Sequence, residues 1–404
     1  MSVEGNISKL YIIRCAKWFM LYMPIIGLFY ADNGLSASQL FLVQAAYSFS
    51  SAVFAIPSGY FADVLGRKKT LILGTILGAI GFLIYAQFHS FRAFFIAEAI
   101  MGVGESCISG TDSAMLYDSL LQSQNQQKYL KYEGRVTSFG CFAETFAALC
   151  GGAIASMFSF NKVFWIQFII ASIAIPAALL LVEPSREKLS HKSFMQIFEI
   201  GFFALFKHKG LSRTTLMSSV IGIATLTMAW TIQTFFVEEQ FTKTQTTVVW
   251  VLLNLTVAIS SITSDWLERH WGIKPMVLLM VLVVPLGYFA FAVPSLWVVF
   301  GMAFLFYFVR GYATPILKEL IQNYCDSEIR ATVLSVRGLL IRIGFSIVGP
   351  FIGYMSDNYS FSFATIAAGV LFLITSLGGY LSYLQLRKYE KNNSGNTLYE
   401  QREQ

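Results

Sequence analysis

Long apolar runs separated by short polar segments make up most of the chain. Two of these runs, 39–57 and 70–88, approach the length of about 20 residues that a helix needs to cross a bilayer. Similar runs continue to the end of the sequence and predict twelve membrane-spanning helices. We place them near residues 10–30, 39–57, 70–88, 93–121, 135–157, 163–182, 213–236, 246–266, 274–293, 295–318, 331–355 and 361–385. The predicted fold class is an all-α membrane protein of two six-helix bundles.

The connection between the two halves differs from the other loops. It carries six cations around the apolar run 194–206, which is too short to span a bilayer, so we expect a helix at the cytoplasmic interface. The predicted organisation is an N-terminal bundle at 1–182, this linker at 183–213, a C-terminal bundle at 214–386 and a disordered cytoplasmic tail at 387–404.

The composition agrees with a membrane protein. Hydrophobic residues make up 55% of the chain and charged residues 13%, about half the share of a soluble protein. Of the 29 lysines and arginines, only Arg92, Lys162 and Lys243 fall in predicted outer loops, which places both termini on the cytoplasmic side. We expect a monomeric multi-pass protein of a bacterial inner membrane. Arg14 and Lys17, near the cytoplasmic end of the first helix, are expected to reach the lipid headgroups.

Several classes of function are disfavoured. The net charge of +6 is spread over loops and forms no basic face for nucleic acid. The five cysteines and four histidines have no disulfide or metal-ligand spacing. No nucleophile or phosphate-binding constellation is present, so we predict neither an enzyme nor a cofactor.

The two halves share a local pattern. Residues 133–137 (Glu-Gly-Arg-Val-Thr) enter the fifth predicted helix, and residues 328–332 (Glu-Ile-Arg-Ala-Thr) enter the eleventh. Since these positions are equivalent in the two bundles, the pattern indicates duplication of a six-helix unit.

A charged elbow joins the second and third apolar runs. It reads Gly59-x-x-x-Asp63-x-x-Gly66-Arg67-Lys68-Lys69. We expect the first glycine to allow close helix approach and the second to permit the turn, while the cations hold the loop in the cytoplasm. The elbow closely resembles the loop 2–3 signature of the major facilitator superfamily of secondary transporters.

This resemblance implies a gate. Asp63 would cap the cytoplasmic end of the eleventh helix, and Arg67 would pair with an acid at the end of the fourth helix, where Asp118 is the best-placed candidate. These contacts would hold the two halves in the outward-facing state and break when the protein opens inward.

Two positions depart from superfamily patterns. In the fourth helix, Glu98 stands where the signature has arginine before Gly102 and Gly104. In the fifth helix, Ala147-Ala148 stands where antiporter families have Gly-Pro. We therefore do not assign to this chain the proton relay that depends on that arginine. The chain is also not assigned as a drug antiporter from the resemblance alone.

Ionisable residues within predicted spans are the main candidates for chemistry. Glu98, Glu105 and Asp112 recur every seven residues and predict one stripe along the fourth helix. Three more lie in other helices: Glu144, Arg310 and Arg342. Each charge costs about 2.5–3.5 kcal/mol at the bilayer centre, so these groups should face a watery cavity or one another.

The superfamily architecture places the first, fourth, seventh and tenth helices at the central cavity, which implies that Glu105 meets Arg310. Protonation of a carboxylate or arrival of substrate would release this attraction. Glu98 or Glu144, if unpaired, would carry the proton, and the two arginines would hold an anionic group of the substrate. Permanent ion pairs that only orient helices are the alternative. Further expected cavity walls are Tyr22, Trp230, Gln233 and Tyr307.

The favoured function is proton-coupled export of a small organic solute such as a drug, metabolite or siderophore. Uptake of a nutrient such as an amino acid or organic acid is the alternative. A sensor that binds a ligand without transporting it is the third possibility.

Overall fold

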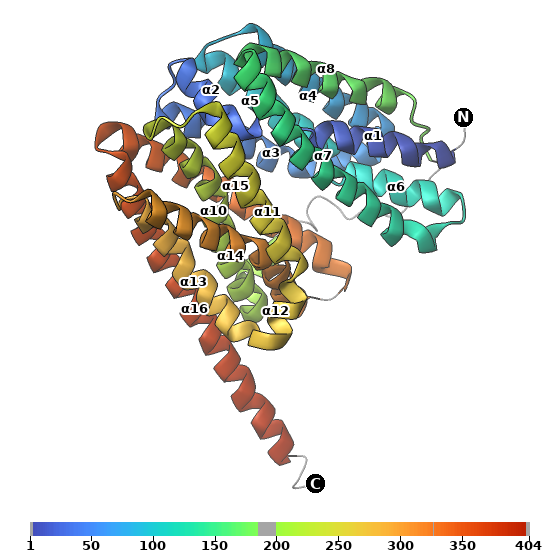
Figure 1. Ribbon diagram of the computed structural model, residues 1–404. Helices are drawn as coiled ribbons and strands as arrows, with labels where there is room; N and C mark the ends of the chain where they lie inside the picture. Colours follow the sequence, from blue (N-terminus) through green and yellow to red (C-terminus); the bar gives the residue numbers. More distant parts are fainter. Residues whose placement is uncertain (1–2, 185–198, 326, 401–404) are drawn as a thin grey trace. The chain divides into compact units, whose positions relative to one another are not determined.

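The computed structural model describes residues 3–184, 199–325 and 327–400, and every regular element in these ranges is a helix (Figure 1). The first half contains α1 (Asn6–Trp18), η2 (Met23–Ile25), α2 (Ile26–Asp32), α3 (Ala37–Val64), α4 (Arg67–Gln87), α5 (Phe91–Ile108), α6 (Thr111–Gln122), α7 (Tyr129–Met157) and α8 (Phe160–Leu179). The second half contains α10 (Lys209–Glu238), α11 (Lys243–Ile262), α12 (Ser264–Trp271), α13 (Ile273–Ala290), α14 (Leu296–Gln322), α15 (Ser327–Asn358) and α16 (Phe361–Glu400).

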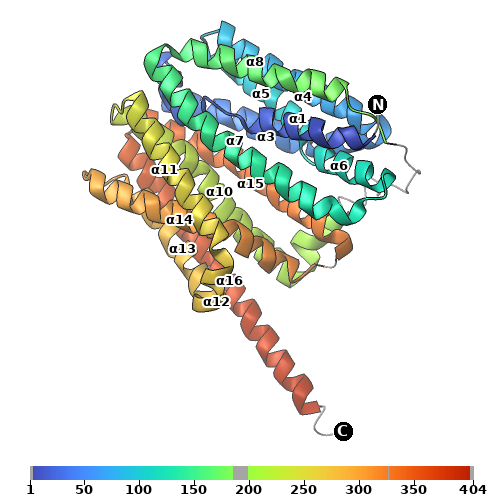
Figure 2. The ribbon, with the colours of Figure 1, turned by 45° about the vertical axis from the view of Figure 1, so that its right-hand side comes forward.

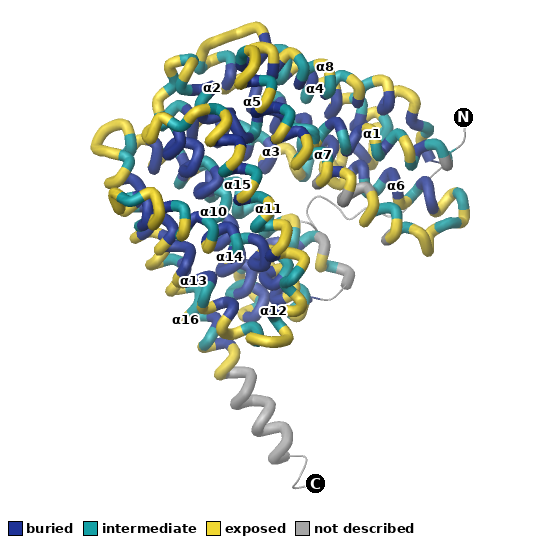
Figure 3. Tube along the Cα trace, in the orientation of Figure 1, coloured by how far each residue is buried: buried dark blue, intermediate teal, exposed yellow. Residues whose placement is uncertain are grey.

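The helices have the length and composition of membrane spans. Within the described ranges, 11 spans are long and apolar enough to cross a membrane, counting α1 with α2 and α5 with α6 as single spans. The apolar part of α7, Phe142–Met157, is shorter. Large apolar side chains such as Ile169 and Ile173 on α8 are 58% and 50% exposed, as expected where a helix faces lipid (Figure 3). The all-helical membrane class is confirmed, while twelve spans and cytoplasmic termini stay predictions.

Two spans of the first half are interrupted. The first breaks between α1 and η2, and η2 contains Pro24, whose ring removes one backbone donor from the helix. The fourth breaks between α5 and α6, where Gly110 has a φ of +83° that other residues rarely adopt. The single fourth helix expected to carry the three acids is therefore wrong: Glu98 and Glu105 lie on α5 and Asp112 lies on α6.

Close backbone contacts hold α5 between α3 and α4 (Figure 2). A Cβ atom at Gly102 would lie 2.4 Å from the carbonyl oxygen of Tyr47 on α3. A Cβ atom at Gly104 would lie 2.9 Å from the carbonyl oxygen of Gly74 on α4. The two glycines noted in the fourth apolar run thus allow two neighbouring helices to approach the same helix on different sides.

Tyr288 anchors α13, which contacts α14 and α16. The ring of Tyr288 lies 5.0 Å from that of Phe372, and its hydroxyl donates to the carbonyl oxygen of Ala224 at 2.6 Å. A buried hydroxyl in hydrocarbon needs such a partner, so this hydrogen bond ties α13 to α10.

The helices group into two compact units. One contains Met1–His191, Trp230–Leu252 and Phe345–Asn358, and the other contains the rest of the chain. The first unit therefore includes parts of α10, α11 and α15 from the second half of the sequence. The domain boundaries expected from sequence stay predictions.

The linker and the tail are described in part. Residues 185–198 and 401–404 lie outside the described residues, including the start of the expected interfacial segment. Residues 199–207 are helical and end in a π-helical turn, Phe203–Lys207, with the side chain of Phe206 72% exposed. Where a disordered tail was predicted from residue 387, α16 continues as a helix to Glu400.

The Gly102 contact yields a stability prediction. We expect Gly102→Ala to destabilise the protein by about 1–3 kcal/mol, because the new methyl group cannot fit against the α3 backbone. Gly78→Ala on α4 is the matched control, since its Cβ would meet no atom within 4 Å. Thermal unfolding in detergent, followed by size-exclusion chromatography, should show a lower midpoint for Gly102→Ala alone; equal midpoints would contradict the contact.

Candidate functional site

A buried arginine joins three segments of the first unit. Arg14 on α1 is 8% exposed and donates through Nε and Nη2 to Asp112 Oδ2 at 2.9 and 2.6 Å. Its Nη1 donates to Glu133 Oε1 on α7 at 3.1 Å, and Ser113 Oγ donates to the same oxygen at 2.8 Å. The expectation that Arg14 extends to the headgroups is wrong, because its guanidinium turns inward to two carboxylates.

Lys17 is likewise directed inward. Its Nζ lies 2.8 Å from Glu105 Oε2, and both side chains are largely buried. The expected contact with headgroups is therefore wrong for Lys17 as well. The pair sits beside the two interruptions, since Lys17 lies one residue before the end of α1 and Glu105 three residues before the end of α5.

Side chains from other helices support the interruption of the first span. The amide of Leu21 donates to Gln167 Oε1 on α8 at 2.9 Å. A Cβ at Gly151 on α7 would lie 1.7 Å from the carbonyl oxygen of Leu21, so only glycine fits there. Gln233 on α10 accepts from Gly27 N at 3.2 Å and donates to the carbonyl of Met23 at 3.1 Å. Sequence reasoning assigned Gln233 to a cavity wall, whereas its amide here holds backbone groups of the first span.

Tyr22, another expected cavity wall, is 9% exposed and packs against aromatic rings. Its ring centroid lies 5.3 Å from Phe82 and 5.7 Å from Phe164. Packing is therefore its main observed role.

Glu98 lies in a different environment from the other acids. It is 3% exposed and accepts a hydrogen bond from Tyr85 Oη at 2.8 Å. The Tyr30 hydroxyl contacts that of Tyr85, and Gln44 Nε2 donates to Tyr30 Oη at 3.0 Å. The rings of Phe94 and Phe164 stack on Tyr85 at 4.9 and 5.0 Å. Among the described residues, no cation forms an ion pair with Glu98. Its carboxyl is therefore held by neutral hydrogen-bond donors.

The elbow forms the contact that the resemblance implied for Arg67. The guanidinium of Arg67 pairs with Asp118 on α6 and donates to the carbonyl of Ala114. Gly66 has a φ of +103° and starts α4, which confirms the expected turn. Glu183 accepts from Arg67 N at 2.8 Å and Lys68 N at 2.7 Å, and so caps α4. Sequence reasoning did not assign Glu183 this role, although an acid directly after the sixth apolar run was a visible signal.

Two further predictions for the elbow concern Gly59 and Asp63. Gly59 was expected to allow close helix approach, but its Cβ would meet no atom within 4 Å, because it lies on an exposed side of α3. Within the first unit, Gly59 therefore makes no close helix contact. The capping of the eleventh helix by Asp63 stays a prediction.

The predicted residues of the second half lie on α10, α14 and α15. Arg310 is half-buried, and its guanidinium carbon lies 5.3 Å from the ring centroid of Tyr307, a cation–π arrangement. Arg342 and Trp230 are also half-buried, as is Glu144 on α7. Because Glu105 and Arg310 belong to different compact units, their meeting stays a prediction. Sequence reasoning passed over Arg337, whose Nε donates to Ser218 Oγ.

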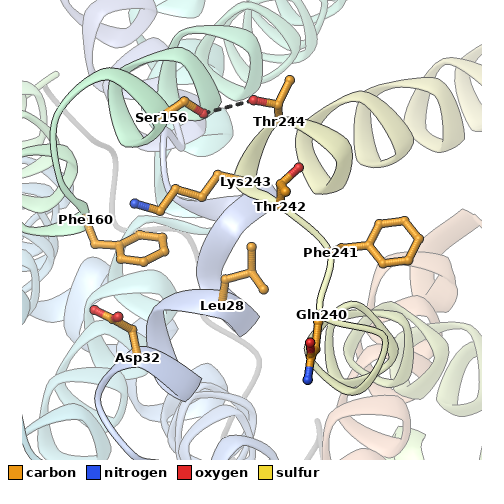
Figure 4. Close-up of a pocket in the computed structure, with 9 residues that line it drawn as sticks. All are labelled: Leu28, Asp32, Ser156, Phe160, Gln240, Phe241, Thr242, Lys243 and Thr244. Atoms are coloured by element: carbon orange, nitrogen blue, oxygen red, sulfur yellow. Dashed lines mark hydrogen bonds between the residues drawn. The ribbon is translucent and has the colours of Figure 1, made fainter.

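An open pocket of about 590 Å³ lies at the end of the first unit that sequence analysis assigns to the outer face (Figure 4). Its lining residues are Leu28, Asp32, Ser156, Phe160, Gln240, Phe241, Thr242, Lys243 and Thr244. None of the predicted cavity residues lines it. Asp32 and Lys243 supply one acid and one base at its walls.

Comparisons with known proteins agree with this architecture. The sequence model of the Major Facilitator Superfamily matches residues 10–313 and 215–401. An uncharacterized transporter of Buchnera aphidicola subsp. Acyrthosiphon pisum is 27% identical over 192 residues, which cover 47% of each chain. This chain thus matches about half the length of that relative. The multidrug resistance protein MdtL of Shewanella sp. is 22% identical over 283 residues, covering 66% of this chain and 68% of MdtL.

The crystal structure of the nucleoside transporter NupG has a similar fold, with a TM-score of 0.76 and 15% identity, over 95% of this chain and 99% of NupG. The interrupted apolar spans, the elbow with its Arg67–Asp118 pair, and the family match over most of the sequence lead to one assignment. This chain is a multi-pass inner-membrane protein that belongs to the Major Facilitator Superfamily of transporters.

Proposed function

We propose that this protein is a proton-coupled secondary transporter that exports a small organic solute by alternating access. Export is favoured because the relative that aligns with two thirds of this chain is a multidrug resistance protein. The solute would be a drug-like compound or an endogenous metabolite.

The environment of Glu98 carries the case for proton coupling. A carboxyl inside a membrane protein is costly and marks proton relays in pumps and transporters. Glu105 and Asp112 each have a cation, so their charge is already balanced. Among the described residues, the hydrogen-bonding groups around Glu98 are hydroxyls and an amide, which accommodate either protonation state through the Tyr85–Tyr30–Gln44 chain. It is therefore the best candidate for binding one proton per cycle.

The Arg14 cluster is a second acidic centre in the same unit. One guanidinium faces two carboxylates, and Glu133 Oε2 is buried without a hydrogen-bond partner. Two carboxylates beside one guanidinium leave one negative charge in excess at this partly buried site, which attracts a cation. We assign this cluster a supporting role in proton coupling, because Asp112 and Glu133 both contact Arg14.

Transport in proteoliposomes tests the function directly. The purified protein would be reconstituted, a pH gradient imposed, and a panel of cationic dyes, amino acids and organic acids followed. Extrusion from the compartment equivalent to the cytoplasm, driven by protons moving the other way, supports the proposal. Accumulation in that compartment would identify an importer, and ligand binding without flux would identify a sensor; either result contradicts export.

Neutralising the proton site should separate coupling from solute movement. We expect Glu98→Gln to reduce transport driven by the pH gradient by about tenfold or more, since the site no longer binds and releases a proton. Exchange of labelled for unlabelled solute across the membrane should persist, because it requires no net proton transfer. Glu268→Gln on α12, outside the spans, is the control and should leave both rates unchanged. Equal loss of driven transport and exchange would contradict a coupling role.

Glu105 in the first half and Arg310 in the second half yield another prediction. We expect Arg310→Ala and Glu105→Gln each to lower solute flux by about tenfold or more, because both groups would contact substrate or each other during the cycle. Arg269→Ala is the control, since Arg269 is exposed and pairs with Asp265 one turn away on the same helix. Wild-type flux in both variants would contradict a cavity role.

Glu105→Gln leaves Lys17 buried without its partner, which can destabilise the protein by itself. The double variant Lys17→Met/Glu105→Gln removes this complication, because it leaves no lone charge. Wild-type flux in the double variant would mean that the pair only orients the two interrupted helices.

A further inference from the structure

The N-terminus of α3 is capped by a carboxylate from a distant helix. Asp357, near the end of α15, accepts from Ala37 N through Oδ1 and from Ser38 N through Oδ2, both at 3.0 Å. The next amide, Gln39 N, donates to the side chain of Ser36, and the two residues form a local capping box. Asp357 therefore accepts hydrogen bonds from the two helix N-terminal amides that the local capping box does not satisfy.

The capping carboxylate lies at the end of a longer contact between α15 and α3. A Cβ at Gly353 would lie 2.8 Å from the Cα of Ser38, so the two backbones nearly touch. Two turns earlier, Ser346 Oγ donates to the carbonyl of Ala45 at 3.3 Å. The contact thus runs along α15 from Ser346 to Asp357 and ends on the positive terminus of α3.

A second contact at the same end joins α11 to α7. Lys243 Nζ donates to the carbonyl of Ala155 at 3.0 Å and lies 4.0 Å from the ring centroid of Phe160. The hydroxyls of Ser156 and Thr244 are 3.2 Å apart (Figure 4). Segments from both halves of the sequence therefore close this end of the first unit. It is the end that the distribution of lysine and arginine assigns to the outer face.

We propose that Asp357 and the α3 N-terminus form a releasable latch at the outer end, which opens and closes once in each transport cycle. This inference rests on the proposed alternating-access function. Asp357 and the start of α3 are accessible to water, so both partners regain hydrogen bonds when they separate. The Gly102 contact has no such compensation, since it joins two backbones inside the bundle. A charge on a helix terminus is strong enough to bias two states and weak enough to release.

Hydrogen exchange of the full-length protein in lipid nanodiscs tests the latch without any substrate. Asp357→Ala should raise amide exchange in residues 36–41 on the order of three- to tenfold, because the capping interaction is lost. If α15 and α3 separate as a latch, exchange should rise by a similar factor at residues 242–248 on α11, which Asp357 does not touch. Gly353→Ala should act in the same direction, since its methyl group pushes the two helices apart.

Two controls distinguish a latch from a local cap. Ser36→Ala removes the capping box and should speed exchange at residues 36–41 only. Asn358→Ala removes a hydrogen bond to Tyr354 within α15 and should change neither region. If Asp357→Ala behaves like Ser36→Ala, or if Gly353→Ala leaves residues 242–248 unchanged, the latch is refuted.

Hydrogen exchange requires no transport of solute, so it tests the latch separately from the proposed transport function. A protein without transport activity that still shows coupled exchange at both regions retains the latch and loses the proposed function. A transporting protein whose two regions respond independently retains the function and loses the latch.

Discussion

Charge inside hydrocarbon must be balanced, and the first half of this protein balances most of its charge within its own bundle. Arg14 and Lys17 on α1 each pair with an acid from the fourth span. A lone charge at that depth costs several kcal/mol, so these pairs fix which faces of the two spans meet. The interruptions after α1 and α5 lie next to the pairs. There the freed backbone groups find other partners, such as Gln167 for the amide of Leu21.

The same constraint separates the acids into two classes. Glu105 and Asp112 have cations and are already neutralised as pairs. Glu98 is buried among tyrosines and a glutamine, and the hydrogen-bond donors that the structure describes around it are neutral. A proton is the simplest partner for such a carboxyl, whereas a paired carboxylate gives up its cation only when the structure rearranges. This difference in environment is the basis for assigning proton binding to Glu98.

The helix contacts also fall into two classes, and the division suits a protein that changes shape. Gly102 and Gly104 bring backbones together in the interior of the first half, where separation would leave a void. At a water-accessible end, Asp357 of α15 caps α3 and Lys243 of α11 contacts α7, through charge and hydrogen bonds. Contacts of the first kind make a rigid bundle. Contacts of the second kind exchange their hydrogen bonds with water at low net cost, which is why we propose that they open during transport.

The sequence by itself determined the membrane class, the approximate positions of the spans, the turn at Gly66 and the Arg67–Asp118 pair. The first three follow from local composition or from residues close together along the chain, whereas the pair was implied by the resemblance of the elbow to a family signature. Only the tertiary structure decided which partner each buried charge takes. Lys17 and Glu105 are 88 residues apart, and Arg14 and Asp112 are 98 apart, so no periodicity relates them. The break at Gly110 placed Asp112 on a different helix from Glu105, and no described atom of the first unit lies within 4 Å of a Cβ at Gly59. Hydropathy shows that a charge in a span needs a partner, but the partner is chosen by distance between helices, which a linear pattern does not contain.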